Sequence, residues 1–184
     1  MKLAVLGVGL IGGSIGLAAR HRGLAEVTGW VRNPDRVDDC LKVGAVDRMA
    51  DSIDSACSEA DVVVCCASVG HLIEMGRKAL EAAPAGCVIT DVGSTKQELV
   101  EALGSDPRFI GGHPLAGAET AGVLNAREDL YEGARWYLTP TSGSEGVLLD
   151  RLQKLVTGLG AKPVAIEARE HDQAMAGGRH PAPV

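Results

Sequence analysis

The residues best suited to chemistry are a histidine and a serine that follow two neighbouring predicted strands. His113 lies in the segment GGHPLAG, and Ser94 lies in the segment DVGSTK. Imidazole titrates near neutral pH, so His113 can accept the hydroxyl proton of a carbinol that is oxidised by loss of hydride. Ser94 can hydrogen-bond the same hydroxyl group. A simpler alternative exists for each: Ser94 caps a helix that starts at Thr95, and His113 bonds a loop carbonyl.

Hydride transfer needs a dinucleotide, and the chain begins with a motif that is typical of such a site. An apolar strand leads into GVGLIGGS, in which Gly7, Gly9 and Gly12 have the spacing Gly-x-Gly-x-x-Gly. The first glycine permits a tight turn, the second lets the backbone approach a pyrophosphate, and the third lets helix and strand pack closely. Leu10 and Ile11 complete the predicted loop, whose helix N-terminus faces the anion. A glycine-rich turn without a ligand is the alternative.

The end of the second predicted strand favours NADP over NAD. An acidic residue about 20 positions beyond the glycines binds the ribose hydroxyl in NAD proteins, but this chain has Val31 at that place and Arg32 next to it. A guanidinium can hold a 2′-phosphate with two hydrogen bonds. Trp30 is a candidate to stack near the adenine, and Ser68 is predicted to line the cofactor cleft. Alternatively, Arg32 is a solvated loop charge and the cofactor is NAD.

Apolar runs of strand length alternate with helical stretches, which indicates an α/β fold with a parallel sheet covered on both faces. Strands are predicted at 2–6, 26–31, 61–67, 87–92, 109–111, 136–139 and 163–166, and helices at about 13–22, 35–43, 71–82, 95–103 and after Ser142. Ser142 and Glu145 have the spacing of a capping box. We expect a Rossmann-type, doubly wound, mainly parallel sheet over 1–168. Residues 169–184 are interpreted as a frayed stub of a second, helical domain.

Open parallel sheets bind ligands at the carboxyl edge of their strands. Both chemical motifs follow strands, so we expect Ser94 and His113 to converge near the nicotinamide end of the dinucleotide. The glycine-rich segment 111–134 has little periodicity in its first half, and long irregular loops of this kind are usually functional. His71 is interpreted as part of a helix start. His171 with Asp172 either hydrogen-bonds across the site or simply begins a helix.

Composition excludes several other classes. The 184 residues carry 18 basic and 24 acidic side chains, a net charge of -6 without a basic run, which argues against nucleic acid as a partner. Five cysteines without C-x-x-C spacing indicate buried, reduced thiols, and no metal site is predicted. No apolar run reaches membrane length and no signal-peptide pattern precedes Leu3, so we expect a cytoplasmic protein without a membrane partner.

The motifs together resemble the prephenate and arogenate dehydrogenase family of tyrosine biosynthesis. The resemblance rests on GVGLIGGS, DVGSTK, GGHPLAGAETAG, DLYEGARWYLTPT and HDQAMA, and it covers residues 1 to about 176. It implies that His113 is the catalytic histidine, that Ser94 supports it in binding substrate, and that Glu119 is an acidic residue near the mouth of the site. The segment GWVRN is similar to members that use NADP. The implied substrate is prephenate or arogenate, and the implied assembly of full-length members is a homodimer.

The resemblance weakens at the end of the chain. In the family, a His-rich motif after His-Asp opens a long helical domain that contacts the substrate carboxylate, whereas this chain has GGRHPAP at 177–183. We therefore expect the isolated chain to bind dinucleotide but to turn over poorly. Two alternatives are another hydroxyacid-type dehydrogenase and a non-enzymatic dinucleotide-binding module. A methyltransferase also suits a glycine-rich first loop but leaves DVGSTK and the His-Pro loop unexplained.

Overall fold

The computed structural model describes residues 1–178 of the chain, in which strands and helices alternate. The strands are β1 (Lys2–Leu6), β2 (Glu26–Trp30), β3 (Arg48–Met49), β4 (Val62–Cys65), β5 (Val88–Asp91), β6 (Gly111–Pro114), β7 (Arg135–Thr139) and β8 (Lys162–Ala165). The helices are α1 (Leu10–His21), α2 (Val37–Lys42), α3 (Ile53–Cys57), α4 (Val69–Ala82), α5 (Gln97–Leu103), α6 (Gly146–Gly158) and α7 (Ala168–Ala176). Two short 3-10 helices are η1 (Pro34–Arg36) and η2 (Val123–Asn125).

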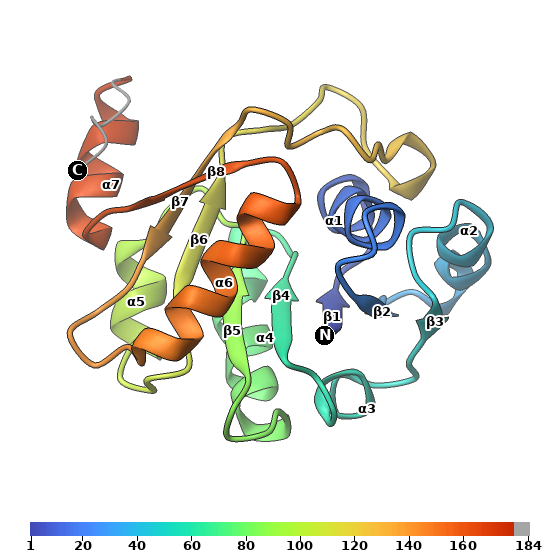
Figure 1. The fold of residues 1–184 in the computed structure, drawn as a ribbon, viewed down its shortest axis with the longest axis horizontal. Helices are drawn as coiled ribbons and strands as arrows, with labels where there is room; N and C mark the ends of the chain where they lie inside the picture. Colours follow the sequence, from blue (N-terminus) through green and yellow to red (C-terminus); the bar gives the residue numbers. More distant parts are fainter. Residues whose placement is uncertain (179–184) are drawn as a thin grey trace.

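Five parallel strands form the main sheet in the order β3-β2-β1-β4-β5, so the chain starts near the middle and winds outward in both directions (Figure 1). A parallel bridge between Ile89 and Phe109 connects β5 to the segment that leads into β6. In the second sheet, β6-β7-β8, β6 is antiparallel to β7 and β7 is parallel to β8. This topology confirms the predicted Rossmann-type, mainly parallel sheet.

Alternate side chains of the central strands enter two separate cores. On β1, Leu3 and Val5 belong to one core, and Ala4 and Leu6 belong to the other. The first core also contains residues of α1, α2 and α6, and the second contains residues of α3, α4 and α5. Strands buried on both faces read as continuous apolar runs, which is why they were predictable. The sheet is therefore packed on both faces, and the loops at its carboxyl edge begin from buried strands.

Helix starts differ from the sequence expectation in several places. Helix α6 begins at Gly146 and has no side-chain cap, so the predicted capping box of Ser142 and Glu145 is wrong. A local turn replaces it, because Ser144 Oγ accepts a hydrogen bond from Thr141 N–H at 2.9 Å. The short elements β3 and α3 were not predicted, since two and five residues are too few to show periodicity.

The C-terminal helix α7 lies in the segment that was interpreted as the stub of a second, helical domain. Residues 168–176 form this helix, which packs beside α5 (Figure 1), and His171 on it is completely buried. A helix in this segment is compatible with the start of a helical domain, and the interpretation of the segment as a frayed stub stays a prediction. Residues 179–184 lie outside the described part of the chain, and a domain boundary at residue 168 stays a prediction.

The five cysteines are free thiols, as predicted. Cys40, Cys57, Cys65 and Cys87 are buried, and Cys66 is half-buried. Burial raises the pKa of Cys57 and Cys87 to about 12, which keeps both thiols protonated at neutral pH. These side chains therefore act as small apolar groups in the core.

Within residues 1–178, no helix is long and apolar enough to cross a membrane. The same residues contain no group of three or more His, Cys, Asp or Glu side chains placed to hold a metal ion.

Candidate active site

The glycine loop between β1 and α1 has the backbone that a dinucleotide site requires. Gly7 has a φ of +96°, a left-handed conformation that strains any residue with a Cβ, and a Cβ there would collide with the Cys66 carbonyl. A Cβ at Gly12 would collide with the Gly7 carbonyl. Both glycines are therefore required for close packing of the turn against β4 and of α1 against the turn, as the motif predicts.

Gly9 borders open space instead. No atom lies within 4 Å of the position that its Cβ would take, and it is the N-cap of α1, where no side chain caps the helix. The first N–H groups of a helix have no partner within the helix, and its N-terminus attracts anions. The loop therefore fits the pyrophosphate of a dinucleotide, which can approach the backbone at Gly9.

A groove of about 380 Å³ runs over this loop. It is lined by Gly7, Gly9, Leu10, Ile11, Gly12, by 66–68 after β4, by Val92, and by Gly117, Ala118, Thr120, Ala121 and Gly122. We call residues 117–122, which follow β6, the roof loop. The structure thus brings the predicted Ser68 to the glycine loop. Glu119 lies in the roof loop but is exposed, between two residues that line the groove.

The chain beyond the roof loop is fastened to α1. The Tyr131 hydroxyl donates a hydrogen bond to the Ile11 carbonyl at 2.7 Å, and Ser14 Oγ accepts one from Arg127 N–H at 2.9 Å. Tyr131 and Ser14 are both buried, and η2 packs against α1. These contacts join the segment that follows the roof loop to α1, the helix that begins at the glycine loop.

Arg32 lies beyond the end of β2 in a second groove of about 380 Å³. This groove is also lined by Trp30, His71, Glu74 and Lys78, among others. The Lys78 ammonium lies 3.2 Å from the Glu74 carboxylate, so one of the two permanent cations already has an anionic partner. His71 Nδ1 hydrogen-bonds Ser68 Oγ at 2.8 Å, which connects this groove to the groove over the glycine loop.

His113 lies on β6, where it pairs with Tyr137 of β7. Burial, followed by the charges of His171 and Lys96, lowers the pKa of His113 to about 4, whereas Asp172 opposes this shift. The imidazole is therefore neutral at neutral pH and able to accept a proton. Its Nδ1 hydrogen-bonds His171 Nε2 at 2.8 Å, so the alternative of a bond to a loop carbonyl is wrong at this nitrogen.

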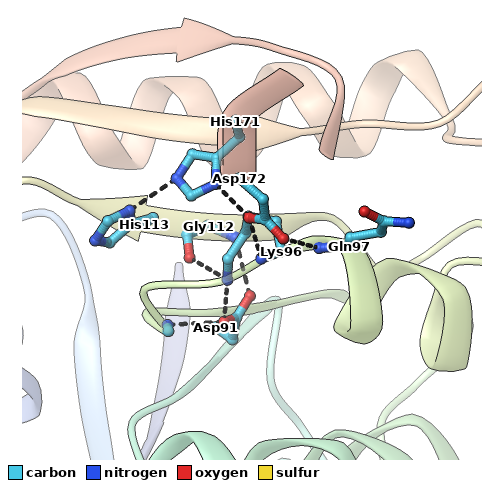
Figure 2. Close-up of polar contacts among 8 residues, drawn as sticks. Asp91, Lys96, Gln97, Gly112, His113, His171 and Asp172 are labelled. Atoms are coloured by element: carbon cyan, nitrogen blue, oxygen red, sulfur yellow. Dashed lines mark hydrogen bonds and ion pairs between the residues drawn. The ribbon is translucent and has the colours of Figure 1, made fainter. Parts of the chain in front are cut away.

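A buried ion pair fixes β6 to the end of β5 (Figure 2). The Lys96 ammonium is completely buried; it contacts the Asp91 carboxylate and donates to the Gly112 carbonyl at 2.7 Å. Asp91 also accepts hydrogen bonds from Gly112 N–H at 3.0 Å and Gly93 N–H at 2.8 Å. Burial lowers the pKa of Lys96, and Asp91 opposes this effect. The pair sets the position of Gly112, and with it the position of His113.

Helix α7 adds a second polar link to the site (Figure 2). His171 Nδ1 hydrogen-bonds Asp172 Oδ1 at 2.8 Å. The Asp172 carboxylate also accepts from Lys96 N–H at 2.8 Å and Gln97 N–H at 2.9 Å, at the start of α5. Burial raises the pKa of Asp172, but the bonds from Gln97, His171 and Lys96 outweigh burial and leave this pKa lowered. Asp172 is therefore an anion at neutral pH.

Ser94 follows β5 and is exposed. Helix α5 begins at Gln97, two residues later than predicted, and no side chain of its N-cap residue Lys96 caps it. Asp172 supplies that function from α7 instead, so the alternative that Ser94 only caps the helix is wrong. A role for Ser94 at a substrate hydroxyl stays a prediction.

Lys96 was not assigned to the site from the sequence, and for His171 and Asp172 a hydrogen bond across the site, which the structure contains, was one of two alternatives. Lys96 is the last residue of DVGSTK, and a lysine between a predicted loop and a predicted helix is normally exposed to solvent, because lysine is rarely buried without a partner. His171 and Asp172 had a helix start as an equally good interpretation. The signal available for these two was their adjacency, since a carboxylate next to a histidine commonly fixes the histidine tautomer.

Comparisons with known proteins agree with this geometry. Residues 15–165 match the family described as "Prephenate dehydrogenase, nucleotide-binding domain". Prephenate dehydrogenase of Bacillus subtilis is 37% identical over 181 residues, which cover 94% of this chain and 48% of that protein. The structure of Synechocystis arogenate dehydrogenase has a TM-score of 0.90 at 29% identity, over 96% of this chain and 63% of that chain. Aquifex aeolicus prephenate dehydrogenase, solved with hydroxyphenyl propionate and NAD+, has a TM-score of 0.88 at 28% identity, over 95% and 63% of the two chains.

The chain spans about half the length of the first curated relatives that it matches. The similarity therefore covers nearly all of this chain and about half of each of those proteins.

Proposed function

The chain belongs to the family of prephenate dehydrogenase nucleotide-binding domains, and we propose that it binds a nicotinamide dinucleotide for the oxidative decarboxylation of prephenate or arogenate. This reaction is a step of tyrosine biosynthesis. The main support for the proposal is that the candidate base and the groove belong to adjoining segments of the chain. His113 lies on β6, and residues of the roof loop, which follows β6, line the groove over Gly9. A neutral imidazole on the strand that leads into this loop suits proton removal beside a bound nicotinamide.

The glycine loop would hold the dinucleotide, whose nicotinamide would supply the hydride acceptor for the substrate ring carbon that carries the hydroxyl group. His113 accepts the hydroxyl proton, and its low pKa keeps it in the neutral form that this requires. Ser94 orients the same hydroxyl, and Glu119 lies near the mouth of the site. The new carbonyl is conjugated to the carbon that bears the carboxylate, so carbon dioxide leaves and the ring becomes aromatic. No metal is needed for this sequence of steps.

We also propose that the cofactor is NADP. Arg32 is exposed on the groove beyond β2 and has no carboxylate at the preceding position, where Val31 stands. Lys78 adds a second cation to the same groove and Glu74 adds one anion, so the three charges leave one net positive charge for a 2′-phosphate. Arginine is the side chain that best matches phosphate geometry.

A polypeptide of residues 1–184 is expected to bind dinucleotide and to turn over poorly. The family resemblance places the contacts to the substrate carboxylate in a helical region that relatives carry and these residues do not cover. The Bacillus subtilis relative provides a way to supply that region, because the chain matches 48% of its length.

The test is a chimera in which residues 1–176 are followed by the C-terminal half of the Bacillus subtilis relative. Formation of reduced nicotinamide is measured with prephenate and with arogenate at saturating NADP+, for the chimera and for its His113→Gln variant. We expect turnover by the chimera and a loss of about 10²- to 10⁴-fold in the variant, the usual contribution of a general base. The His21→Gln variant is the matched control, since His21 lies exposed at the end of α1.

A chimera that binds NADP+ and oxidises neither substrate would contradict the enzymatic proposal and favour a non-enzymatic dinucleotide-binding module. Oxidation of hydroxyacids without a cyclohexadienol ring would instead favour another dehydrogenase class.

A further inference from the structure

We propose that His171 and Asp172 are positioning residues that fix the tautomer of His113, so that His113 presents an unprotonated Nε2 as the base. This inference rests on the proposed function for its catalytic meaning, but the tautomer itself is a property of the free chain. A chain of hydrogen bonds runs from Asp172 through His171 to His113 (Figure 2), and the donor of each bond determines the donor of the next.

The first step is the bond between Asp172 and His171. An ionised carboxylate only accepts hydrogen bonds. His171 Nδ1 lies 2.8 Å from Asp172 Oδ1, so this nitrogen carries the proton. We draw the inference for the neutral His171 ring, in which only one nitrogen carries a proton and Nε2 is therefore an acceptor; a cationic ring would donate from both nitrogens and reverse the bond to His113.

The second step is the bond between His171 and His113, in which the acceptor nitrogen of His171 determines which nitrogen of His113 carries the proton. His113 Nδ1 lies 2.8 Å from His171 Nε2, and it must be the donor because that nitrogen is an acceptor. Nδ1 of His113 is therefore protonated, and Nε2 holds the free lone pair. The nitrogen turned away from α7 is the one that can accept a proton from a substrate hydroxyl.

The surroundings keep both rings in place. His171 is completely buried, and its ring meets the rings of His113 and Tyr137 edge-on, at centroid distances of 5.0 and 5.5 Å. Asp172 cannot rotate freely, because its two oxygens accept the Lys96 and Gln97 N–H groups at the start of α5. When both rings are neutral, only one tautomer of each ring satisfies all of these bonds.

The consequence for catalysis is a balanced proton transfer. The substrate O–H bond breaks as a new N–H bond forms at His113 Nε2, and the resulting imidazolium keeps its Nδ1 proton on the side of His171. The positive charge then lies on a hydrogen-bond chain that ends at the Asp172 anion, which stabilises it. The wrong tautomer would present an N–H group to the substrate hydroxyl and could not accept its proton.

The test is nitrogen-15 NMR of the histidine rings in the 184-residue chain, without substrate or cofactor. Ring nitrogen shifts distinguish protonated from unprotonated nitrogens, and the His113→Gln variant assigns the signals. We expect the Nδ1–H form of His113 to exceed the Nε2–H form by about tenfold or more at pH 7, because the opposite form leaves buried groups unmatched. In His171→Phe, which keeps a ring beside Tyr137 but removes the acceptor, we expect this excess to be lost.

Asp172→Asn is the second variant, because a neutral amide no longer restricts His171 to Nδ1–H, and it too should reduce the excess. His21→Gln is the control and should leave the His113 signals unchanged. An Nε2–H form of His113 in the unmodified chain would overturn the inference even if no variant folds. Retention of the Nδ1–H form in a folded His171→Phe variant would overturn it as well. Neither result depends on turnover, so failure of the proposed reaction would be recognised separately in the chimera.

Discussion

Replacing Lys96 with methionine is predicted to cost the protein a large part of its stability. The Lys96 ammonium is completely buried, and Asp91 is 1% exposed, so neither charge has water as an alternative partner. Methionine fills the space of the lysine stem but leaves the Asp91 carboxylate as an unpaired buried charge. The Gly112 carbonyl also loses its ammonium donor.

Breaking a buried ion pair by removing one partner costs about 3–5 kcal/mol, and a typical domain has only about 5–15 kcal/mol in total. At a urea dependence of about 2 kcal/mol per molar, a loss of about 4 kcal/mol moves the unfolding midpoint down by about 2 M. The double variant Asp91→Asn/Lys96→Met removes both charges, and we expect it to recover at least about 1 kcal/mol relative to Lys96→Met.

Urea unfolding followed by circular dichroism measures these differences. Lys78→Met is the matched control, because Lys78 is exposed and its pair with Glu74 is a surface pair four residues apart, worth at most about 0.5 kcal/mol. If Lys96→Met lowers the free energy of unfolding by less than about 1 kcal/mol, the prediction that breaking the buried ion pair is strongly destabilising is wrong. A double variant less stable than the single one would show that the cost does not come from an uncompensated charge.

Three further predictions concern the grooves and His113. Gly9→Ala should change the free energy of unfolding by no more than about 1 kcal/mol, because the added Cβ meets open space. Calorimetric titration of the same variant should show NADP+ affinity falling about tenfold or more. Gly12→Ala should instead lower the free energy of unfolding by about 1–3 kcal/mol, because its Cβ meets the Gly7 carbonyl. Arg32→Ala should weaken NADP+ binding by about tenfold or more and leave NAD+ binding unchanged; an equal effect on both would reject the assignment. The pKa of His113 is about 4 when folded and 6.5 ordinarily, so the unfolded chain binds the proton first. Stability should therefore fall as pH drops from 6.5 to 4, less steeply in His113→Gln, and an equal slope in both would contradict this pKa.

The sequence was sufficient for the glycine loop because its requirements are local. A Cβ at Gly12 would meet the Gly7 carbonyl in the same turn, a Cβ at Gly7 would meet the carbonyl of Cys66 after the adjoining strand, and Gly9 leaves open space for a ligand; the motif spacing encodes these three requirements. The strands of the main sheet were predictable for a similar reason, since burial on both faces leaves an apolar run. Arg32 was placed correctly beyond β2, because strand order fixes where that loop emerges.

Contacts between distant segments were not predictable in the same way. Asp172 accepts the Lys96 N–H group across 76 positions of the chain, and nothing near Lys96 indicates that partner. The start of α5 at Gln97 depends on this contact, which explains why a local capping rule chose the wrong residue. The Lys96 ammonium likewise bonds the Gly112 carbonyl on β6, and α7 contacts β6 through the bond between His171 and His113.

Whether a dinucleotide occupies the glycine loop can be measured by titrating the nitrogen-15 labelled chain with NADP+ and following the backbone amide signals. Binding there predicts saturable shifts at Gly9, Leu10, Ser68 and Thr120, all of which line one groove. A separate groove of about 380 Å³ lies at the opposite end of β1, beside Met1, Leu24 and Val147. Shifts confined to that groove, or no saturable shifts at all, would contradict dinucleotide binding at Gly9 and the function proposed from it.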